Sequence, residues 1–371
     1  MRVIIERSAL LKALGHVTSV VERRNTIPIL ANVLIETGKG VIRLRATDLD
    51  IEVIETVKAE VATAGRTTVQ ALMIFDIVRK LPDGSQVELA REDDGARLSV
   101  TSGPARFSLQ VLPPDDFPDL SKEDTTHCFS MPAKDLRRLI EKSRFAISTE
   151  ETRYYLNGIY LHESDGKPKA LRAVATDGHR LAQVDVALPK GAKGMPGVIV
   201  PRKTVAELHK LAEESADEVE ISLSAAKIRF VIGDMVLTSK LIDGTFPDYQ
   251  RVIPQGNDKL LQVSNAQFAS AVDRVSTLSS DKGRAVKLQI DEGKLTLSVN
   301  NPDSGSATEE LPVDYDNDAI EIGFNARYLL DISNQLESDT ARFMLSDPGS
   351  PTMVRDDEDE SALYVLMPMR V

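Results

Sequence analysis

The chain has 371 residues, of which 42% are hydrophobic and 27% are charged, which is enough apolar material for two or three domains with real cores. No stretch approaches the ~20 apolar residues of a membrane span, and the N-terminus lacks the long apolar run of a signal peptide, so we expect a cytoplasmic protein without a membrane partner. The formal net charge of -12 argues against a protein that grips nucleic acid by affinity alone.

Several segments along the chain place apolar residues at the spacing of an amphipathic helix that packs on one face. In the first of them, Leu10, Leu14 and Val17 form such a stripe. Ser8 and Asn265 stand where the first and fifth helices would begin, so we expect these two side chains to cap the helix ends. In chain order, helices are predicted at residues 8–24, 72–81, 133–144, 203–211, 265–278 and 326–336.

Between the helices the hydrophobic pattern changes to strict alternation, which is typical of half-buried strands. Asp94-Gly95 and Glu292-Gly293 have the residue types of tight hairpin turns between such strands. The clearest strands are predicted at residues 42–46, 49–53, 219–223, 286–290 and 295–299.

The strand endings repeat along the chain. Phe117-Pro118-Asp119 and Phe246-Pro247-Asp248 lie about one domain length apart, and residues 363–368 read like a third closing strand. The pattern predicts three similar α+β domains, each built from two strand-helix-strands units. We expect boundaries near Thr125 and Pro254, which gives an N-terminal domain at 1–125, a central domain at 126–254 and a C-terminal domain at 255–371.

No catalytic constellation is found. The five histidines do not have the spacing of a helical metal pair, the single Cys128 cannot form a zinc knuckle, and no glycine-rich phosphate loop occurs. The run from Thr176 to Arg180 packs Asp, His and Arg together, but we interpret it as a turn between strands. The acidic run from Asp356 to Glu360 lacks calcium-loop spacing, and we interpret it as a solvated hairpin tip. We therefore expect no catalytic residue, no metal and no cofactor, which disfavours an enzyme acting on nucleic acid.

Several stretches, in order and at domain-length spacing, carry a resemblance to a known family. Two of them read Arg153-Tyr154-Tyr155-Leu156-Asn157-Gly158 and Ala175-Thr176-Asp177-Gly178-His179-Arg180-Leu181, and the others cover residues 26–30, 200–203, 246–249 and 365–370. Over its whole length the chain resembles the bacterial DNA polymerase III beta subunit, the beta sliding clamp or processivity factor of DNA replication.

The resemblance implies a DNA clamp fold and a non-catalytic function. Two three-domain subunits of the family form a head-to-tail homodimer, a closed ring with helices lining its hole. Such a ring encircles double-stranded DNA without sequence preference. It tethers the DNA polymerase III alpha subunit, the clamp loader and other proteins with a clamp-binding motif. Only the inner wall must be positive, so an acidic exterior does no harm. The alternative is a protein-binding scaffold without DNA enclosure, and the basic first helices and the full-length resemblance argue against it.

The resemblance also implies three sets of site residues. A pocket for partner peptides would combine Arg153, Tyr155, Leu156, Thr176, Gly178, His179, Arg180, Leu181, Pro247, Arg251, Val252, Asn325, Tyr328, Val365, Met367, Pro368, Met369 and Arg370. DNA-binding candidates are Arg24, Lys134, Arg137, Arg138, Tyr154, Tyr155 and Arg202, and dimer contacts are expected at Phe107, Leu109 and Leu278. Near the pocket, residues 348–351 depart from the family pattern.

Overall fold

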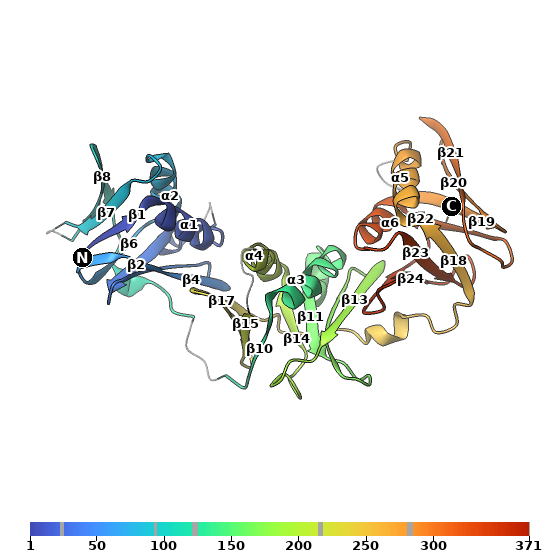
Figure 1. Cartoon of the computed structure of the whole chain (residues 1–371), viewed down its shortest axis with the longest axis horizontal. Helices are drawn as coiled ribbons and strands as arrows, with labels where there is room; N and C mark the ends of the chain where they lie inside the picture. Colours follow the sequence, from blue (N-terminus) through green and yellow to red (C-terminus); the bar gives the residue numbers. More distant parts are fainter. Residues whose placement is uncertain (23–25, 93–94, 121–124, 214–217, 280–284, 371) are drawn as a thin grey trace. The chain divides into compact units, whose positions relative to one another are not determined.

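The computed structural model describes residues 1–22, 26–92, 95–120, 125–213, 218–279 and 285–370. These residues form two compact units, each with its own sheets and helices (Figure 1). The first unit consists of residues Met1–Arg137, Pro189–Ala192 and Lys203–Leu241. The second unit consists of residues Arg138–Leu188, Lys193–Arg202 and Ile242–Val371.

The first unit contains two antiparallel sheets. One has the strand order β5 (Glu60–Thr63), β1 (Arg2–Glu6), β7 (Gln86–Arg91), β8 (Arg97–Ser102) and β9 (Ala105–Gln110). The other has the order β10 (His127–Pro132), β15 (Glu218–Leu223), β16 (Lys227–Ile232), β17 (Met235–Lys240), β4 (Ile51–Lys58), β3 (Val41–Thr47), β2 (Asn32–Gly38) and β6 (Gly65–Gln70).

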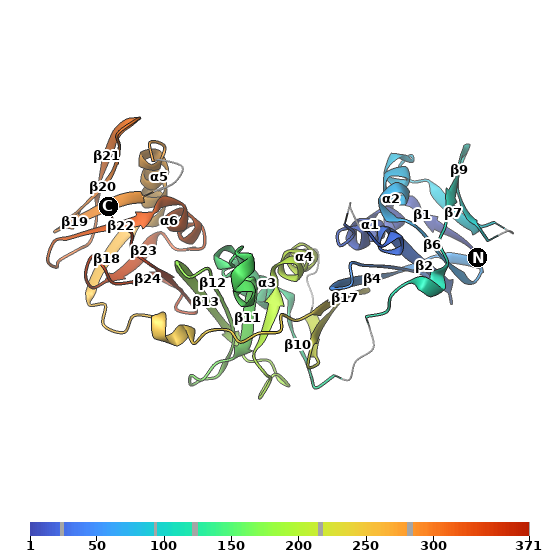
Figure 2. The same cartoon turned by 180° about the vertical axis from the view of Figure 1, so that it is seen from behind.

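Two helices of the first unit, α1 (Arg7–Thr18) and α2 (Ala71–Lys80), lie side by side in both views (Figures 1 and 2). The predicted stripe on α1 faces the interior of the unit, because Leu10, Leu14 and Val17 are completely buried. Burial of one aliphatic side chain contributes roughly 1.5–3 kcal/mol, so the stripe holds the helix on the unit. Two further helices, α3 (Ala133–Glu141) and α4 (Arg202–Glu213), follow in the chain.

The second unit repeats this plan. Its larger sheet has the order β14 (Val198–Pro201), β11 (Gly158–Glu163), β12 (Ala170–Thr176), β13 (Arg180–Ala187), β25 (Ala362–Leu366), β24 (Thr352–Asp356), β23 (Thr340–Leu345) and β18 (Lys259–Ser264). Its smaller sheet has the order β21 (Gly305–Pro312), β20 (Lys294–Asn301), β19 (Ala285–Asp291) and β22 (Ile320–Asn325). The helices α5 (Asn265–Ser276) and α6 (Ala326–Ser333) pack against each other.

Both larger sheets join strands from distant parts of the sequence. In the first unit β17 pairs with β4, and in the second unit β13 pairs with β25, each in antiparallel register. The last pairing runs from Arg180 opposite Leu366 to Val184 opposite Ala362. Every residue of β25 is buried. The closing strand predicted at the end of the chain is therefore confirmed, and its partner is a strand nearly two hundred positions earlier in the sequence.

The α+β class and all the predicted helices are confirmed, but the predicted helix caps are wrong. α1 begins one residue before Ser8, and the Ser8 hydroxyl donates to the Glu6 carboxylate instead of to a helix end. α5 follows Ser264, and Asn265 lies inside the helix, where its amide donates to the carbonyl of Ser333 in α6. A tertiary partner thus takes the Asn265 side chain, whereas Ser8 bonds to a neighbour two residues earlier in the chain.

The turn at Glu292-Gly293 between β19 and β20 is confirmed, with Gly293 at a φ of 69°. The turn predicted at Asp94-Gly95 includes Asp94, which lies outside the described residues. Within the described parts of the chain, no helix is long and apolar enough to cross a membrane.

Candidate functional site: an apolar cavity on the second unit

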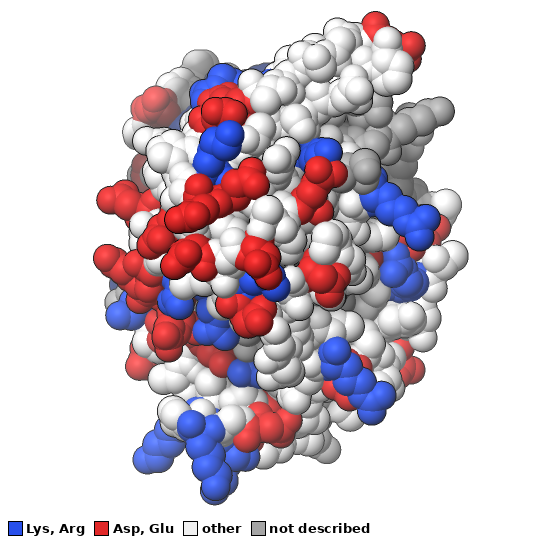
Figure 3. Space-filling view, turned by 90° about the vertical axis from the view of Figure 1, so that its right-hand side faces the viewer, with Lys and Arg blue, Asp and Glu red and all other residues white. Residues whose placement is uncertain are grey.

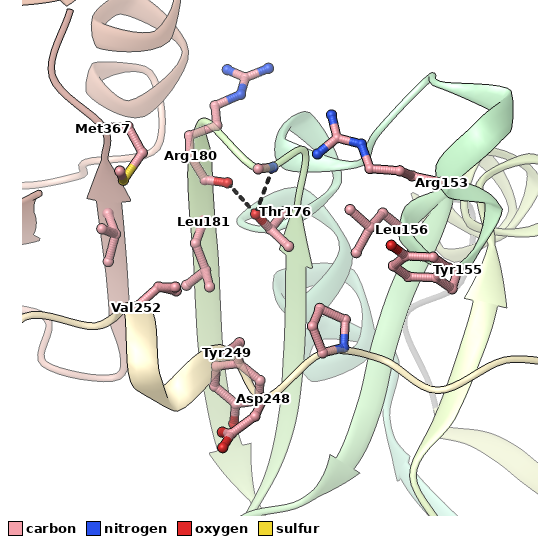
Figure 4. Close-up of a pocket in the computed structure, with 13 residues that line it drawn as sticks. Arg153, Tyr155, Leu156, Thr176, Arg180, Leu181, Asp248, Tyr249, Val252 and Met367 are labelled. Atoms are coloured by element: carbon pink, nitrogen blue, oxygen red, sulfur yellow. Dashed lines mark hydrogen bonds between the residues drawn. The ribbon is translucent and has the colours of Figure 1, made fainter.

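The second unit contains a cavity of about 320 Å³ (Figure 4). Its walls come from the ends of β12, β13 and β25, from the 3-10 segment η4 (Glu151–Leu156), and from the segment that leads into η5 (Tyr249–Val252). The lining residues are Arg153, Tyr155, Leu156, Thr176, Gly178, Arg180, Leu181, Pro247, Asp248, Tyr249, Val252, Val365 and Met367.

The floor of the cavity is apolar and firmly packed. Leu156, Leu181 and Val365 belong to one buried hydrophobic cluster that also contains the Tyr249 ring. The opening is apolar as well, because Val252 is 48% exposed and Met367 is 40% exposed. Two large apolar side chains are exposed to solvent beside a preformed apolar cavity. Such a patch indicates a binding site, because exposed apolar surface is unfavourable until a ligand covers it. The flexible thioether of Met367 suits a surface that receives more than one ligand.

One wall of the cavity is the tight turn between β12 and β13, as the sequence predicted for the run from Thr176 to Arg180. The Thr176 hydroxyl donates to the carbonyl of Arg180 at 2.7 Å and accepts the backbone N–H of Gly178 at 3.1 Å (Figure 4). Gly178 has a φ of 88°, a conformation that side chains disfavour. A Cβ at this position would lie 2.5 Å from Nη1 of Arg153, so the glycine also makes room for the arginine.

Arg153 holds its place at the rim through Glu150. Its guanidinium donates two hydrogen bonds to the two carboxylate oxygens, at 2.8 and 2.6 Å. The hydrogen bond from Arg153 lowers the pKa of the Glu150 carboxyl below its usual range. The Arg153 side chain is about one third exposed, so it remains accessible to a ligand in the cavity.

Arg180 is held more tightly. Its guanidinium donates to Asp177 at 3.1 Å, to Asp331 at 2.5 Å and to the carbonyl of Phe145 at 2.6 Å. It also stacks over the Tyr328 ring, 4.2 Å from the ring centroid. With its side chain only 7% exposed, Arg180 supports the wall of the cavity and has little surface left for a ligand.

The structure brings most of the predicted pocket residues together. Those that line the cavity are Arg153, Tyr155, Leu156, Thr176, Gly178, Arg180, Leu181, Pro247, Val252, Val365 and Met367. Those that do not line it are His179, Arg251, Asn325, Tyr328, Pro368, Met369 and Arg370. Two lining residues, Asp248 and Tyr249, are absent from the predicted set. The stretch 246–249 that carried the resemblance contains both, so this signal could have found them.

The predicted residues outside the lining have other contacts. Asn325 caps α6 by accepting the backbone N–H of Arg327 at 3.0 Å. The backbone N–H of Met369 donates to the carbonyl of Gly323 at 2.8 Å, which ties the end of the chain to β22. Arg251 is exposed and pairs with Asp248 at 2.7 Å. Residues 348–351, where the sequence departs from the family pattern, lie between β23 and β24 and do not line the cavity.

The DNA-binding candidates differ in how free their side chains are. Lys134, Tyr154 and Arg202 are exposed, whereas Tyr155 is half-buried at the cavity. Arg138 is paired with Asp359 and lies 3.7 Å from Glu337. Arg137 is partly buried on α3, and Arg24 lies outside the described residues.

Acidic residues near the end of the chain hold structure together, so the predicted solvated hairpin tip at residues 356–360 is wrong in part. The segment does join β24 and β25, but Asp356 is buried and accepts backbone N–H groups of Glu337, Ser338 and Glu358. Burial alone would raise the pKa of Asp356, and these hydrogen bonds outweigh burial and lower the pKa to about 2. On the face drawn in Figure 3, acidic side chains gather over one area, with basic side chains among them and around them.

The predicted dimer contacts lie at a sheet edge and a helix end. Phe107 and Leu109 are on β9, the last strand of its sheet, where Phe107 is 37% exposed and Leu109 is 9% exposed. Leu278 follows α5 and is half-buried, and its carbonyl accepts the side-chain amide of Asn301 at 3.0 Å.

Comparison with known families covers nearly the whole chain. Residues 1–121 match the N-terminal domain of the DNA polymerase III beta subunit, residues 130–248 match its central domain, and residues 250–370 match its C-terminal domain.

Full-length relatives agree with these matches. The chain is 52% identical to the beta sliding clamp of Caulobacter vibrioides and 41% identical to that of Escherichia coli, in both cases over 100% of each protein. Among solved structures, the sliding clamp of Bartonella birtlesii bound to griselimycin is 56% identical and superposes with a TM-score of 0.97, again over 100% of both chains.

A clamp fold matched from end to end by three consecutive domains of a replication protein defines the class of the chain, a processivity factor. The chain belongs to the DNA polymerase III beta subunit family, the beta sliding clamps. It works in DNA replication as a homodimeric ring that encircles duplex DNA and tethers the polymerase and the clamp loader. This function replaces the alternative of a scaffold without DNA enclosure.

Proposed function

We propose that the cavity on the second unit is where this clamp binds the short peptide motifs of the DNA polymerase III alpha subunit, the clamp loader and other partners. One observation carries the proposal: residues that the family resemblance implies, from four stretches far apart in sequence, converge on a single apolar cavity. Its volume of about 320 Å³ is at the lower end for a ligand pocket, which suits one or two side chains of a short peptide.

Replacing Gly178 with alanine tests this role. The new Cβ meets Arg153 and must adopt a left-handed conformation, which costs roughly 1–2 kcal/mol. We expect the clamp to remain folded but to bind a Gln-Leu-x-Leu-Phe peptide about tenfold more weakly, because the wall and the rim arginine both shift. Calorimetric titration of the intact dimer measures the change.

Gly293→Ala is the matched control. Gly293 also has a positive φ, but nothing lies within 4 Å of its missing Cβ and it is far from the cavity in sequence and fold. It should lower the melting temperature through strain while leaving peptide affinity within about twofold of wild type. Equal loss of affinity in both variants would contradict the proposed site.

We propose that DNA passes close to Arg24, Lys134, Arg137, Tyr154, Tyr155 and Arg202. The exposure of Lys134, Tyr154 and Arg202 supports this role. Arg138 was part of the same predicted set, but its carboxylate partners compete with phosphate for its guanidinium. We therefore infer that Arg138 contributes less to DNA binding than Arg202 does.

Retention on DNA should depend on topology rather than on affinity. Direct binding to short linear duplex should be weak and strongly salt-dependent, because only a few cations meet phosphates. Loaded on a closed circle, the clamp should resist moderate salt, and cutting the circle should release it by sliding. Gel filtration of the DNA before and after cutting measures retention. Equal retention on circular and linear DNA would contradict enclosure.

We further propose that Phe107, Leu109 and Leu278 form the subunit contact and that the protein works in the cytoplasm. The edge position of β9 and the exposed Phe107 side chain support the contact, since an obligate interface is more apolar than the rest of a surface. The proposed domain boundaries remain at 1–125, 126–254 and 255–371.

A further inference from the structure

Tyr249 belongs both to the cavity wall and to a polar network behind it. Its ring lines the cavity, while its hydroxyl lies 3.0 Å from Nε2 of His162, a residue that is only 9% exposed. The same hydroxyl oxygen accepts a hydrogen bond from Nη1 of Arg172 at 3.2 Å. Arg172 in turn is fixed by Asp185, to which it donates two hydrogen bonds of 2.7 Å.

The hydrogen bonds select one protonation state of His162. Its Nδ1 lies 2.7 Å from the carbonyl oxygen of Glu163, and a carbonyl can only accept, so Nδ1 carries the proton. Nε2 then has a free lone pair and accepts the hydroxyl proton of Tyr249, whose oxygen is left to accept from Arg172. Each group is satisfied only while the imidazole is neutral.

Aromatic packing connects His162 to the wall of the cavity. The Tyr160 ring stacks on His162 with a centroid distance of 4.6 Å and on Phe246 with a distance of 4.9 Å and an interplanar angle of 6°. Phe246 also contacts the Tyr249 ring edge-on, with centroids 6.4 Å apart. The segment that carries Pro247 and Asp248 is thus held against β11 at both of its ends.

We propose that His162 is a positioning residue for the peptide cavity, and that its protonation loosens Tyr249 and weakens peptide binding. The proposal rests on the proposed role of the cavity as the peptide site. A proton on Nε2 converts the acceptor into a donor, so the Tyr249 hydroxyl loses the group that accepts its proton. It also places a second cation beside Arg172.

The groups around His162 determine the pH range of the effect. Burial lowers the pKa of the imidazole and is the largest effect. The hydrogen bond to the Glu163 carbonyl and the carboxylates of Asp165 and Asp185 oppose it, and the cation of Arg172 lowers the pKa further. The remaining neighbours are the Tyr249 and Tyr160 rings, and Glu163, which is paired with Lys169.

Because the folded-state pKa is lower than the ordinary value of about 6.5, unfolded chains bind the proton more readily than the folded clamp does. The stabilising contribution of the neutral imidazole is therefore complete above about pH 6.5 and is lost as the pH falls below that value.

The experiment measures affinity for a Gln-Leu-Ala-Leu-Phe peptide with an acetylated N-terminus and an amidated C-terminus, which carries no titratable group. Calorimetry with the intact dimer at pH 7.5 and at the lowest pH, below 6.5, at which the dimer stays folded should give an affinity about threefold to tenfold lower at the acidic pH, as expected for one disrupted hydrogen bond. His162→Gln should keep the affinity at pH 7.5 within about twofold and abolish the pH dependence. The reason is that a glutamine amide can accept from Tyr249 and donate to Glu163 without titrating.

Two further variants complete the test. Tyr249→Phe keeps the ring but removes the hydroxyl, and should bind the peptide weakly at both pH values. His179→Gln removes an exposed imidazole on the neighbouring turn and should leave the pH dependence intact.

Three results would overturn the proposal: a wild-type affinity that does not change with pH, a pH dependence that survives in His162→Gln, or one that disappears in His179→Gln. Wild-type clamp that fails to bind the peptide at either pH would instead contradict the cavity as a peptide site, and the inference with it. Thermal unfolding of each variant at pH 7.5 separates loss of fold from loss of positioning.

Discussion

Deleting Met367 to Val371 should leave a dimer that encircles DNA but no longer binds a Gln-Leu-x-Leu-Phe peptide or supports processive synthesis. β25 ends at Leu366, so the paired strand survives the deletion. What is lost is the Met367 side chain at the mouth of the cavity and the backbone hydrogen bonds of Met367 and Met369. Burying one anchor side chain contributes roughly 1.5–3 kcal/mol, which is about tenfold to more than a hundredfold in affinity. Calorimetry measures the binding, and primer extension at limiting polymerase measures processivity.

The single substitution Met367→Ala should account for about tenfold of this loss. Met73→Ala is its matched control, because Met73 is a methionine of similar exposure on α2 and is not part of the cavity. Unchanged peptide affinity in the truncated dimer would place the peptide site elsewhere. An unfolded product would instead mean that the last residues are needed for the fold.

A charge at the proposed subunit contact should separate the ring into folded monomers. Leu278→Asp and Phe107→Asp each bury a carboxylate against apolar neighbours on association, a cost that can reach several kcal/mol when the charge has no partner. We expect the dissociation constant to rise by at least a hundredfold for Phe107→Asp, whose side chain is 37% exposed in the single chain and would be covered in the dimer. Sedimentation velocity measures the change, and retention on circular DNA should be lost with it.

Val252→Asp provides the reciprocal control. It places the same charge on a still more exposed apolar residue, but at the mouth of the cavity. It should abolish peptide binding and leave the dimer intact. Phe107→Asp should instead give a monomer that still binds the peptide. A Leu278→Asp or Phe107→Asp protein that sediments as an intact dimer would remove these residues from the interface.

The helices could be predicted because each buries one apolar face. The helical spacing of buried residues such as Leu10 and Leu14 indicates such a face in the sequence. Helix ends were less predictable: Ser8 and Asn265 have the chemistry of caps, yet each finds a different partner in the folded chain. The pairing of β13 with β25 could not be predicted, because an alternating pattern indicates which face of a strand is buried but not which strand lies beside it.

The site residues were predicted from the family resemblance, because the residue pattern alone does not identify them. Read alone, Leu181 and Val365 are ordinary core residues, and the structure does bury both. They are part of a site because the cavity lies beside them. The cavity forms only where side chains distant in sequence come together, which the sequence pattern does not show. The same limit applies to Arg180: the sequence shows a charged side chain, but not that four groups of the second unit enclose it.

The strand β25 makes the C-terminal part of the chain dependent on the middle part for its solubility. Its five residues, Ala-Leu-Tyr-Val-Leu, are all buried, and one of its two edges is covered only by β13. A fragment cut out at residues 255–371 would expose that edge as a bare apolar strand, ready to pair with the same strand of another copy. We therefore expect a cut between the central and C-terminal parts of the chain to favour aggregation.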